Sequence, residues 1–141
     1  MDHTAITNHS PFSRGLQRET KRAAVLSCAA KLLNTKGARS TTLTDIASRL
    51  GLTKTSLYYY VSNKEDLIYQ CYQANMQQAY DQLDLAVQQH SAPLACLLAF
   101  FESQIAKTLR SIDGEGDFYA APLEFASLKA EHRTVLEAAY R

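Results

Sequence analysis

The sequence predicts an all-α protein, and three observations lead to this prediction. Apolar residues recur with a period near 3.6 along most of the 141 residues, as they do in amphipathic helices. Only three prolines and five glycines are present, and most of them lie between the periodic segments, where turns are expected. With 46% hydrophobic residues and no apolar run near the roughly 18 residues that span a membrane, the chain is expected to fold around a core in water.

The first helix is expected from about Arg18 to Lys36. Its apolar residues have the spacing of one helix face, and they are Val25, Cys28, Ala29, Leu32 and Leu33. Gly37 follows at the position where a helix commonly ends in a left-handed residue. The residues before this helix show neither periodicity nor the apolar segment of a secretory signal. Residues 1–17 are therefore expected to form a flexible tail.

Two short helices are expected next. The first begins after Thr41 or Thr42, either of which can cap it, and Gly51 closes it; its apolar residues are Leu43, Ile46, Ala47 and Leu50. The second is capped by Thr53 and runs from Lys54 to about Val61, with Leu57 and Val61 facing inward.

A long fourth helix is expected from Lys64 to His90. Asn63 can cap it, and the acids that follow lie in its first turn, where the helix dipole favours negative charge. One side stays apolar over its whole length, which is roughly 40 Å at about 1.5 Å per residue.

The remaining chain is also helical in character. A fifth helix starts at Pro93, a tolerated first-turn position, and its apolar stripe is Leu94, Leu97, Leu98, Phe101, Ile105 and Leu109. Residues 113–117 are expected to form a loop, and breaks are expected at Pro122 and near Lys129. The last stripe stops at Arg141 without a cap, so the helix is expected to continue and the chain to be a truncated product.

Charge divides the chain into two halves. Residues 1–64 hold ten Lys and Arg against three Asp and Glu, a net charge of +7. Residues 65–141 hold five basic residues against eleven acids, a net charge of −6. A basic front half on an acidic back half suggests a module that binds a polyanion, joined to a second part with another role.

Residues 41–60 have the pattern of a helix-turn-helix. Ala47 is small where two helices would cross closely, Gly51 permits the turn, and apolar residues fill the space between the helices: Ile46, Leu50, Leu52 and Leu57. The second helix is then free to enter a major groove while the first crosses the DNA backbone. Three consecutive tyrosines, 58–60, cannot all be buried, because successive residues face different sides of a helix.

Chemistry assigns candidate roles to the exposed positions. Lys54 can donate to guanine O6 and N7, and the Thr55 methyl can contact a thymine methyl. Tyrosine hydroxyls and Lys64 suit phosphate oxygens. Thr42 can offer its hydroxyl and free backbone N–H groups to another phosphate. A helical wheel half-buries Tyr60 at the edge of the inward face.

The segment from Val25 to Gly37, the helix-turn-helix, and the run Leu57-Tyr-Tyr-Tyr-Val-Ser-Asn-Lys-Glu-Asp-Leu67 resemble the DNA-binding domain of TetR-type (TetR/AcrR) transcriptional regulators. The resemblance covers about Arg18 to Gln78. It implies DNA-contacting roles for eight residues: Thr42, Lys54, Thr55, Ser56, Tyr58, Tyr59, Tyr60 and Lys64.

The resemblance also implies an architecture and partners. Residues 18–78 would form the helix-turn-helix DNA-binding domain, and the long fourth helix would join it to a partial ligand-binding and dimerisation domain in residues 79–141. The partners would be a palindromic double-stranded DNA operator, an unknown small-molecule effector and a second copy in a homodimer. The family dimerises through two later helices that this chain does not supply, so we also consider a truncated regulator that acts as a protein-interaction module through heterodimers.

Other functions find little support in the sequence. No nucleophile–base pair, metal-ligand cluster or glycine-rich phosphate loop is recognisable, so no enzyme activity, cofactor or metal is expected. Cys28, Cys71 and Cys96 show no disulfide or zinc spacing and are expected to be small apolar residues in a reduced, cytoplasmic protein. His90 and His132 are expected at the surface. Five aromatic residues can line a ligand pocket or simply fill the core: Phe100, Phe101, Phe118, Tyr119 and Phe125.

Overall fold

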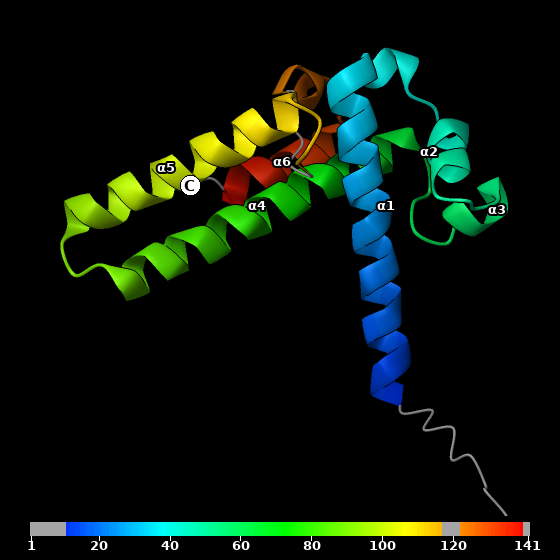
Figure 1. The fold of residues 1–141 in the computed structure, drawn as a ribbon. Coiled ribbons are helices and arrows are strands. Elements are labelled where there is room, and N and C mark those ends of the chain that lie inside the picture. The colour runs from blue at the N-terminus through cyan, green and yellow to red at the C-terminus, as the bar shows by residue number, and fades with distance from the viewer. Residues whose placement is uncertain (1–10, 117–121, 140–141) are drawn as a thin grey trace, which may run out of the picture.

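A computed structural model describes residues 11–116 and 122–139, and every regular element in these residues is a helix (Figure 1). The α-helices are α1 (Pro11–Ser40), α2 (Leu43–Arg49), α3 (Lys54–Leu57), α4 (Lys64–Gln89), α5 (Pro93–Ile112) and α6 (Ala130–Ala139). A 3₁₀ helix, η1 (Pro122–Ser127), precedes α6. The predicted all-α fold is confirmed, and so is the predicted break near Lys129. Residues 117–121 lie outside the described residues, so the break predicted at Pro122 stays a prediction.

Helix α1 begins at Pro11, earlier than the start near Arg18 that periodicity predicts. It replaces the expected tail over residues 11–17, while residues 1–10 lie outside the described residues. Proline suits the first turn of a helix, and the following turns carry no apolar stripe that a search for periodicity would find. The helical backbone is interrupted at Gly37, where φ is 74° and ψ is 161°, at the predicted end of this helix.

Side-chain caps start the next three helices at the predicted residues. Thr42 accepts a hydrogen bond from the Asp45 N–H in a capping box with the Asp45 carboxylate. Thr53 accepts from the Ser56 N–H, and Asn63 accepts from the Asp66 N–H. These bonds satisfy N–H groups that have no partner within the first turn of a helix.

One hydrophobic core holds α1, α2, α3 and the first half of α4 together. The predicted stripe of α1 meets residues of the three other helices and of the connection between α3 and α4, among them Ile46, Ala47, Leu57, Val61, Leu67, Ile68 and Cys71. Ala29, Ile46, Leu57 and Leu67 have no exposed surface. This core fixes the positions of α2 and α3 relative to α1.

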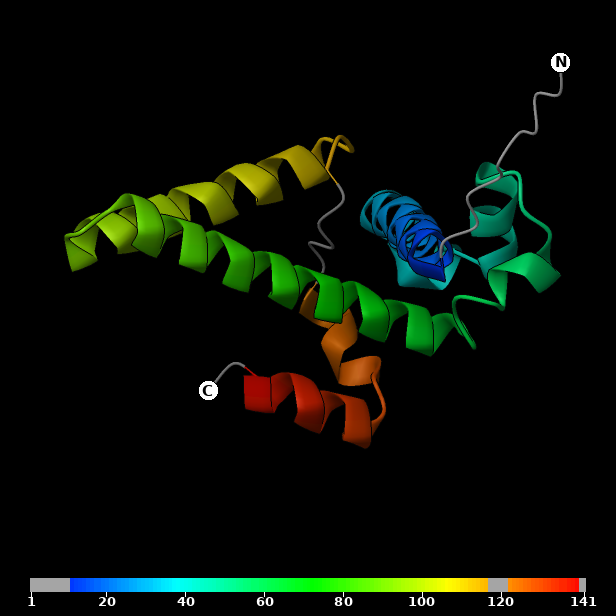
Figure 2. The ribbon, with the colours of Figure 1, turned by 90° about the horizontal axis from the view of Figure 1, so that it is seen from below.

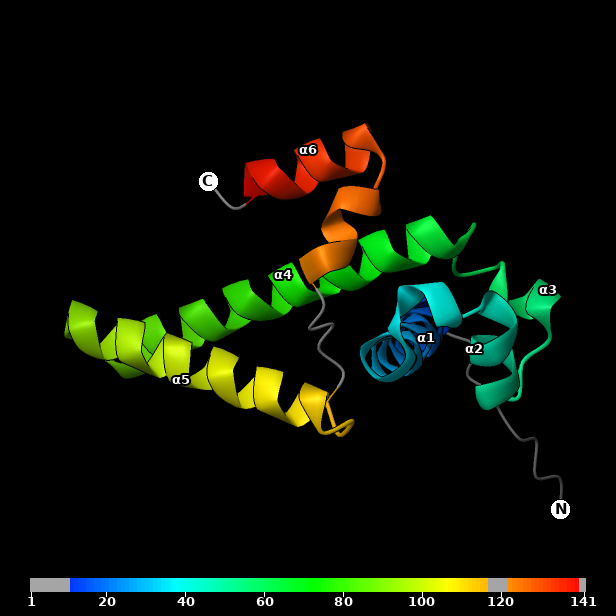
Figure 3. The same cartoon turned by 90° about the horizontal axis from the view of Figure 1, so that it is seen from above.

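Helix α4 is the spine of the molecule. Its 26 residues span about 39 Å at ~1.5 Å per residue, so it leaves the core and continues well beyond it. Figures 2 and 3 show α5 along one side of α4 and α6 on the other. The Ser103 hydroxyl donates to Gln82 Oε1 over 2.8 Å between α5 and α4. On the other side, the Tyr80 hydroxyl donates to the Ala139 carbonyl of α6.

The apolar stripe of α5 is present but uncovered among the described residues. Its residues are between 49% and 67% exposed: Leu94, Leu97, Leu98, Phe101, Ile105 and Leu109. The apolar stripe predicted at the end of the chain lies in α6. Its residue Leu136 is buried, whereas Val135 is exposed. None of the described helices is both long and apolar enough to span a membrane.

Candidate nucleic-acid interface

Helices α2 and α3 form a helix-turn-helix with a tight connection. The Leu52 N–H donates to the Ala47 carbonyl over 2.8 Å, which closes the turn around Gly51. Gly51 has a φ of 65°, a left-handed conformation in which residues with a side chain are strained. Ala47 is 2% exposed, so its small side chain lies where the two helices cross.

Helix α3 is shorter than the predicted range of Lys54 to about Val61. It ends at Leu57, and residues 58–60 form turns in which the N–H groups of Tyr59 and Tyr60 donate to carbonyls three residues earlier. The 3₁₀-type spacing tightens the end of the helix and changes the directions of the tyrosine side chains relative to an ideal α-helical wheel.

The front of this unit presents polar and aromatic side chains. Five of the predicted contact residues are exposed: Lys54, Thr55, Ser56, Tyr58 and Tyr59. Tyr59 is 79% exposed and Tyr58 is 48% exposed, far more than tyrosines that serve a core. The Lys54 ammonium lies 5.9 Å from the centre of the Tyr58 ring, within cation–π range. The exposed surface of α3 and of the turn after it therefore combines a positive charge, hydroxyls and phenols.

Tyr60 and Lys64 are placed differently from these five. Tyr60 is half-buried against the core, as the helical wheel predicts. Its carbonyl accepts a hydrogen bond from Gln70 Nε2 over 3.0 Å. Lys64 is half-buried as the first residue of α4. Both lie beside the exposed face rather than at its centre.

Thr42 is exposed, but its donors are occupied. Its backbone N–H and its hydroxyl both donate to Asp45 Oδ2, over 2.9 and 2.8 Å. The sequence predicts free donors at this position, whereas both are occupied in the structure. A phosphate at this position would have to displace Asp45, whose carboxylate repels it.

Lys21 is a basic residue at this surface that is not among the DNA-contacting residues predicted from the sequence. With Ser56, Tyr59 and Tyr60 it lines a groove of about 480 Å³ between α1 and the helix-turn-helix. The helical spacing of α1 could have indicated this position, because Lys21 precedes the buried Val25 by four residues and so lies on the same side of the helix.

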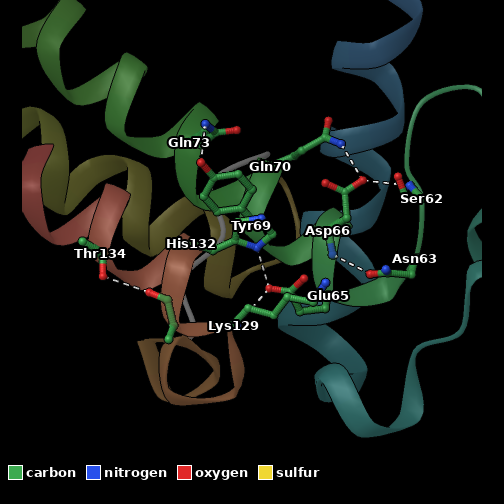
Figure 4. A network of polar contacts seen from close by, with 11 residues as sticks. Ser62, Asn63, Glu65, Asp66, Tyr69, Gln70, Gln73, Lys129, His132 and Thr134 are labelled. Carbon is green, nitrogen blue, oxygen red and sulfur yellow. Dashed lines mark hydrogen bonds and ion pairs between the residues drawn. The ribbon is translucent and has the colours of Figure 1, made fainter.

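Figure 4 shows polar contacts that connect the start of α4 to its neighbours. Asp66 Oδ2 accepts from the Ser62 N–H over 2.8 Å and from Gln70 Nε2 over 3.0 Å. Gln70 Oε1 in turn accepts from Arg22 Nε of α1 over 2.9 Å. Gln70 is only 9% exposed, and its amide joins α1, the end of the tyrosine turn and α4.

The same turn of α4 also holds α6. Glu65 Oε1 accepts from the Lys129 N–H over 3.1 Å and lies 2.7 Å from His132 Nδ1, which donates because an ionised carboxylate can only accept. The His132 ring stacks on Tyr69 with centroids 3.9 Å apart, so this histidine is partly buried rather than a free surface residue. Burial raises the pKa of Glu65, but the two hydrogen bonds and the charges of His132 and Lys129 together lower it further, and the net pKa lies below its ordinary value.

Residues 25–71 match the model of a family described as bacterial regulatory proteins, tetR family. This region is a TetR-type helix-turn-helix domain. The match lies within the segment for which the sequence predicts the resemblance, and it includes α2, α3 and the first turns of α4.

The TetR-like fold extends over most of the chain. PfmR, a TetR family transcriptional regulator from Thermus thermophilus, superposes with a TM-score of 0.66 and 26% identity over 82% of this chain and 62% of that one. The ketosteroid transcriptional regulator KstR2 of Mycobacterium tuberculosis superposes with a TM-score of 0.64 and 20% identity, over 85% of this chain and 60% of that one. A structure described as superantigen pfit superposes with a TM-score of 0.69 and 22% identity, over 84% of this chain and 57% of that one. The last two similarities show the fold alone.

This chain thus spans between 57% and 62% of the length of these three structures. A comparison with curated protein sequences finds no match.

A mainly apolar cavity lies between α4, α5 and α6, outside the segment that the family model matches. It has a volume of about 290 Å³ and is lined by Met76, Ala79, Tyr80, Leu83, Phe100 and Ala139. The aromatic residues considered for a ligand pocket are divided: Phe100 lines the cavity, Phe101 is 53% exposed, and Phe125 packs edge-on against Tyr72. Phe118 and Tyr119 lie outside the described residues.

Cys28 and Cys71 pack as small apolar residues. Cys71 is 2% exposed, and burial raises the pKa of its thiol to about 12. Burial also raises the pKa of Cys28, although Arg49 and Lys31 oppose the effect. Both thiols are therefore protonated near neutral pH and poor nucleophiles. Within the described residues, no group of three His, Cys, Asp or Glu side chains is arranged to hold a metal ion.

Proposed function

We propose that this protein is a sequence-specific DNA-binding transcriptional regulator, a cytoplasmic repressor that a small-molecule ligand releases from DNA. The observation that carries the proposal is the exposed surface of α3 and of the turn after it, where five side chains project from a packed helix-turn-helix: Lys54, Thr55, Ser56, Tyr58 and Tyr59. A protein without a polyanionic partner has little reason to expose two adjacent tyrosines beside a lysine on its most basic half.

The contact residues fall into two groups by position. Lys54 and Thr55 start α3, the end that reaches base edges when a recognition helix enters the major groove. Tyr58, Tyr59, Tyr60 and Lys64 lie at and beyond the end of α3 and suit phosphates on either side. Lys21 joins this second group, because it shares a groove with Ser56 and Tyr59. Thr42 is the weakest member, since Asp45 occupies its donors.

The test begins with selection of genomic DNA fragments by the purified chain at physiological salt. A homodimer would enrich a palindrome whose half-sites are one or more helical turns apart. Lys54→Ala is expected to lower the preference for this site over a scrambled duplex, whereas Lys64→Ala is expected to weaken both duplexes about equally. Competition binding measures both effects, and equal, uniform losses in the two variants would contradict the assignment.

Salt dependence provides an independent measurement. Each phosphate contact made by a basic residue releases counterions, so the logarithm of the affinity should fall linearly with the logarithm of the salt concentration. Lys64→Ala should reduce the slope by about 1, while Lys129→Ala, at an exposed position just before α6, should leave it unchanged.

Ligand release would act through α4. This helix begins at Lys64 beside the DNA-binding face, and its residues Met76, Ala79, Tyr80 and Leu83 line the apolar cavity. A compound that fills the cavity and displaces α4 would therefore move Lys64 and the tyrosine turn relative to a second DNA-binding domain. Compounds that bind the cavity are expected to raise the dissociation rate of the DNA complex, which surface-immobilised operator DNA would report.

The second candidate function is an interaction module that forms heterodimers without tight operator binding. The uncovered stripe of α5 favours it, because such a face normally packs against another element. A folded chain that enriches no DNA sequence and shows no steep salt dependence would decide for the interaction module.

A further inference from the structure

Three basic side chains meet at a cavity on the side of α1 away from the helix-turn-helix. The cavity has a volume of about 270 Å³ and is lined by Ser27, Lys31, Lys107, Arg110, Ser111, Glu115 and Gly116. Figures 1 and 3 show α1 between the C-terminal end of α5 and the pair α2–α3. The cavity is therefore separate from the surface proposed to bind DNA, and it differs from the apolar cavity between α4, α5 and α6.

The charges around this cavity are unbalanced. Lys31, Lys107 and Arg110 bring three positive charges, against the single carboxylate of Glu115. Within the described part of the chain, no ion pair joins any of the three to a carboxylate. Lys31 and Lys107 are half-buried. Like charges that are partly removed from water repel one another, and a bound anion would offset this cost.

Helix formation accounts for the position of only one of these three basic residues. Arg110 lies in the last turn of α5, where the helix dipole favours a cation. Lys107 is one turn earlier, and Lys31 belongs to α1. Residues 65–141 carry a net charge of −6 and only five basic residues, yet two of these five line this one cavity.

The rim of the cavity is a well-defined turn. The N–H groups of Glu115 and Gly116 both donate to the Arg110 carbonyl, over 2.9 and 3.1 Å. A Cβ atom at Gly116 would lie 2.5 Å from Ser111 Oγ and 3.0 Å from the Ser111 N, so only glycine fits there. Ser111 is fully buried beneath it, and its hydroxyl has no hydrogen-bond partner in the described structure. The turn therefore holds Gly116 and Arg110 in fixed positions at the cavity.

We propose that this cavity binds a small phosphomonoester, with the phosphate between Lys31 of α1 and Lys107 and Arg110 of α5. A phosphate dianion matches the net charge of the lining, and a guanidinium can donate two parallel hydrogen bonds to it. At ~30 Å³ per water molecule, the volume equals that of about nine waters, which leaves room for a short organic group. Because α1 and α5 both supply side chains, the bound phosphate bridges the DNA-binding half to the second half.

The experiment titrates the full ¹⁵N-labelled chain with glycerol 3-phosphate, inorganic phosphate and, as the neutral control, glycerol, at ionic strength kept constant with KCl. Amide resonances of Ser27, Gly116 and Glu115 are expected to shift and saturate at millimolar glycerol 3-phosphate. Glycerol is expected to shift none of them. Thermal unfolding of the same samples is expected to move to higher temperature as the phosphate site fills.

Two double variants test whether the basic residues are the cause. Lys107→Gln with Arg110→Gln is expected to weaken binding at least tenfold. Lys36→Gln with Arg39→Gln removes the same charge from exposed positions outside the cavity lining and is expected to leave binding unchanged. Circular dichroism verifies that both variants fold.

The proposal is overturned if the shifts at Gly116 survive in the Lys107 and Arg110 variant, or if they follow ionic strength alone. Shifts confined to residues 54–64 would also overturn it, because they would report phosphate affinity of the DNA-binding face. Glycerol 3-phosphate binding no more tightly than inorganic phosphate would overturn the assignment of a phosphomonoester. None of these measurements depends on DNA binding, so they separate this proposal from the proposed function.

Discussion

Helices α1 and α5 carry the same kind of apolar stripe and meet opposite fates. In α1 the stripe residues Val25, Ala29, Leu32 and Leu33 are at most 3% exposed, because α2, α3 and α4 cover them. In α5 the corresponding residues are about half exposed or more, and the buried residue of the helix is Ser111. Periodicity therefore shows that a helix has an apolar face but does not show what lies against that face.

The difference separates two parts of the molecule. We call α1, α2, α3 and α4 up to Met76 the head, and the rest of α4 with α5 the body. The head is closed by a continuous core and three side-chain caps, so α3 is presented in a fixed orientation. The hairpin of α4 and α5 leaves the core after Met76, and beyond that residue only Ala86 of α4 is buried. A ligand or the face of another helix can therefore cover the exposed apolar residues of the body without unfolding the head.

The largest expected effect is a matched pair of truncations in the two stripes. Leu33→Ala, at a residue 1% exposed on α1, is expected to cost about 2–5 kcal/mol of unfolding free energy. Leu98→Ala, at a residue 55% exposed on α5, is expected to cost less than about 0.5 kcal/mol. Urea unfolding followed by circular dichroism measures both.

A loss at Leu98 as large as that at Leu33 would break the comparison, because it would mean that α5 is covered in solution. Ile46→Val, at a fully buried residue of α2, provides a milder variant of the core that keeps the chain folded and is expected to cost about 0.5–1.5 kcal/mol.

The next effect concerns α6, which Glu65 holds by polar contacts. Glu65→Gln is expected to cost about 1–2 kcal/mol at pH 7, because it removes the charge that accepts from His132 and the Lys129 N–H. The folded-state pKa of Glu65 lies below the ordinary value of 4.5, so its contribution is present above that pH and is lost as the pH falls through the folded-state pKa. Unfolding measured from pH 7 to pH 3 should therefore lose more stability in the native protein than in the variant.

Glu131→Gln is the control for this pH dependence, since Glu131 is an exposed acid in the first turn of α6. If Glu131→Gln flattens the pH dependence as much as Glu65→Gln does, the contacts at Glu65 are not the cause.

A smaller effect tests the caps that distinguish the head from α5. Thr42→Ala removes the acceptor for the Asp45 N–H and is expected to cost about 1 kcal/mol. Thr44→Ala, at an exposed neighbour within α2, is expected to change stability by a few tenths of a kcal/mol at most. Ala92 at the start of α5 makes no side-chain cap, so Ala92→Asp is expected to add up to about 1 kcal/mol. Thermal unfolding of the three variants measures the differences, and an unchanged midpoint for Thr42→Ala would argue against the capping box.

The smallest expected change in stability comes from a charge on the open face of α5. Ile105→Lys is expected to shift the unfolding free energy by less than about 0.5 kcal/mol and to reduce the binding of a hydrophobic fluorescent dye. Ala106→Lys places the same charge one residue away and should reduce dye binding less. Equal dye binding in the native chain and both variants would mean that this face is closed in solution.

The sequence by itself determined the local structure of this protein. Thr42, Thr53 and Asn63 each have a side chain that can accept an N–H bond three residues later, so the starts of three helices could be predicted from residue type and spacing. Gly51 and the small Ala47 marked the crossing of α2 and α3 for the same reason. The start of α1 at Pro11 was not predicted, because Phe12 and Leu16 are the only large apolar residues of its first turns and do not extend the stripe of Val25 and Leu32.

Tertiary structure decided which of these groups are available. The sequence predicts free donors at Thr42, but Asp45 occupies them in the capping box. It predicts a surface position for His132, but folding places Glu65 and Tyr69 of α4 beside this ring. Lys31 and Lys107 are 76 positions apart in the chain and meet at one cavity only because α1 packs against α5. Periodicity and capping act within a few residues along the chain, whereas burial and electrostatic environment depend on segments that folding brings together, so only the folded chain fixes them.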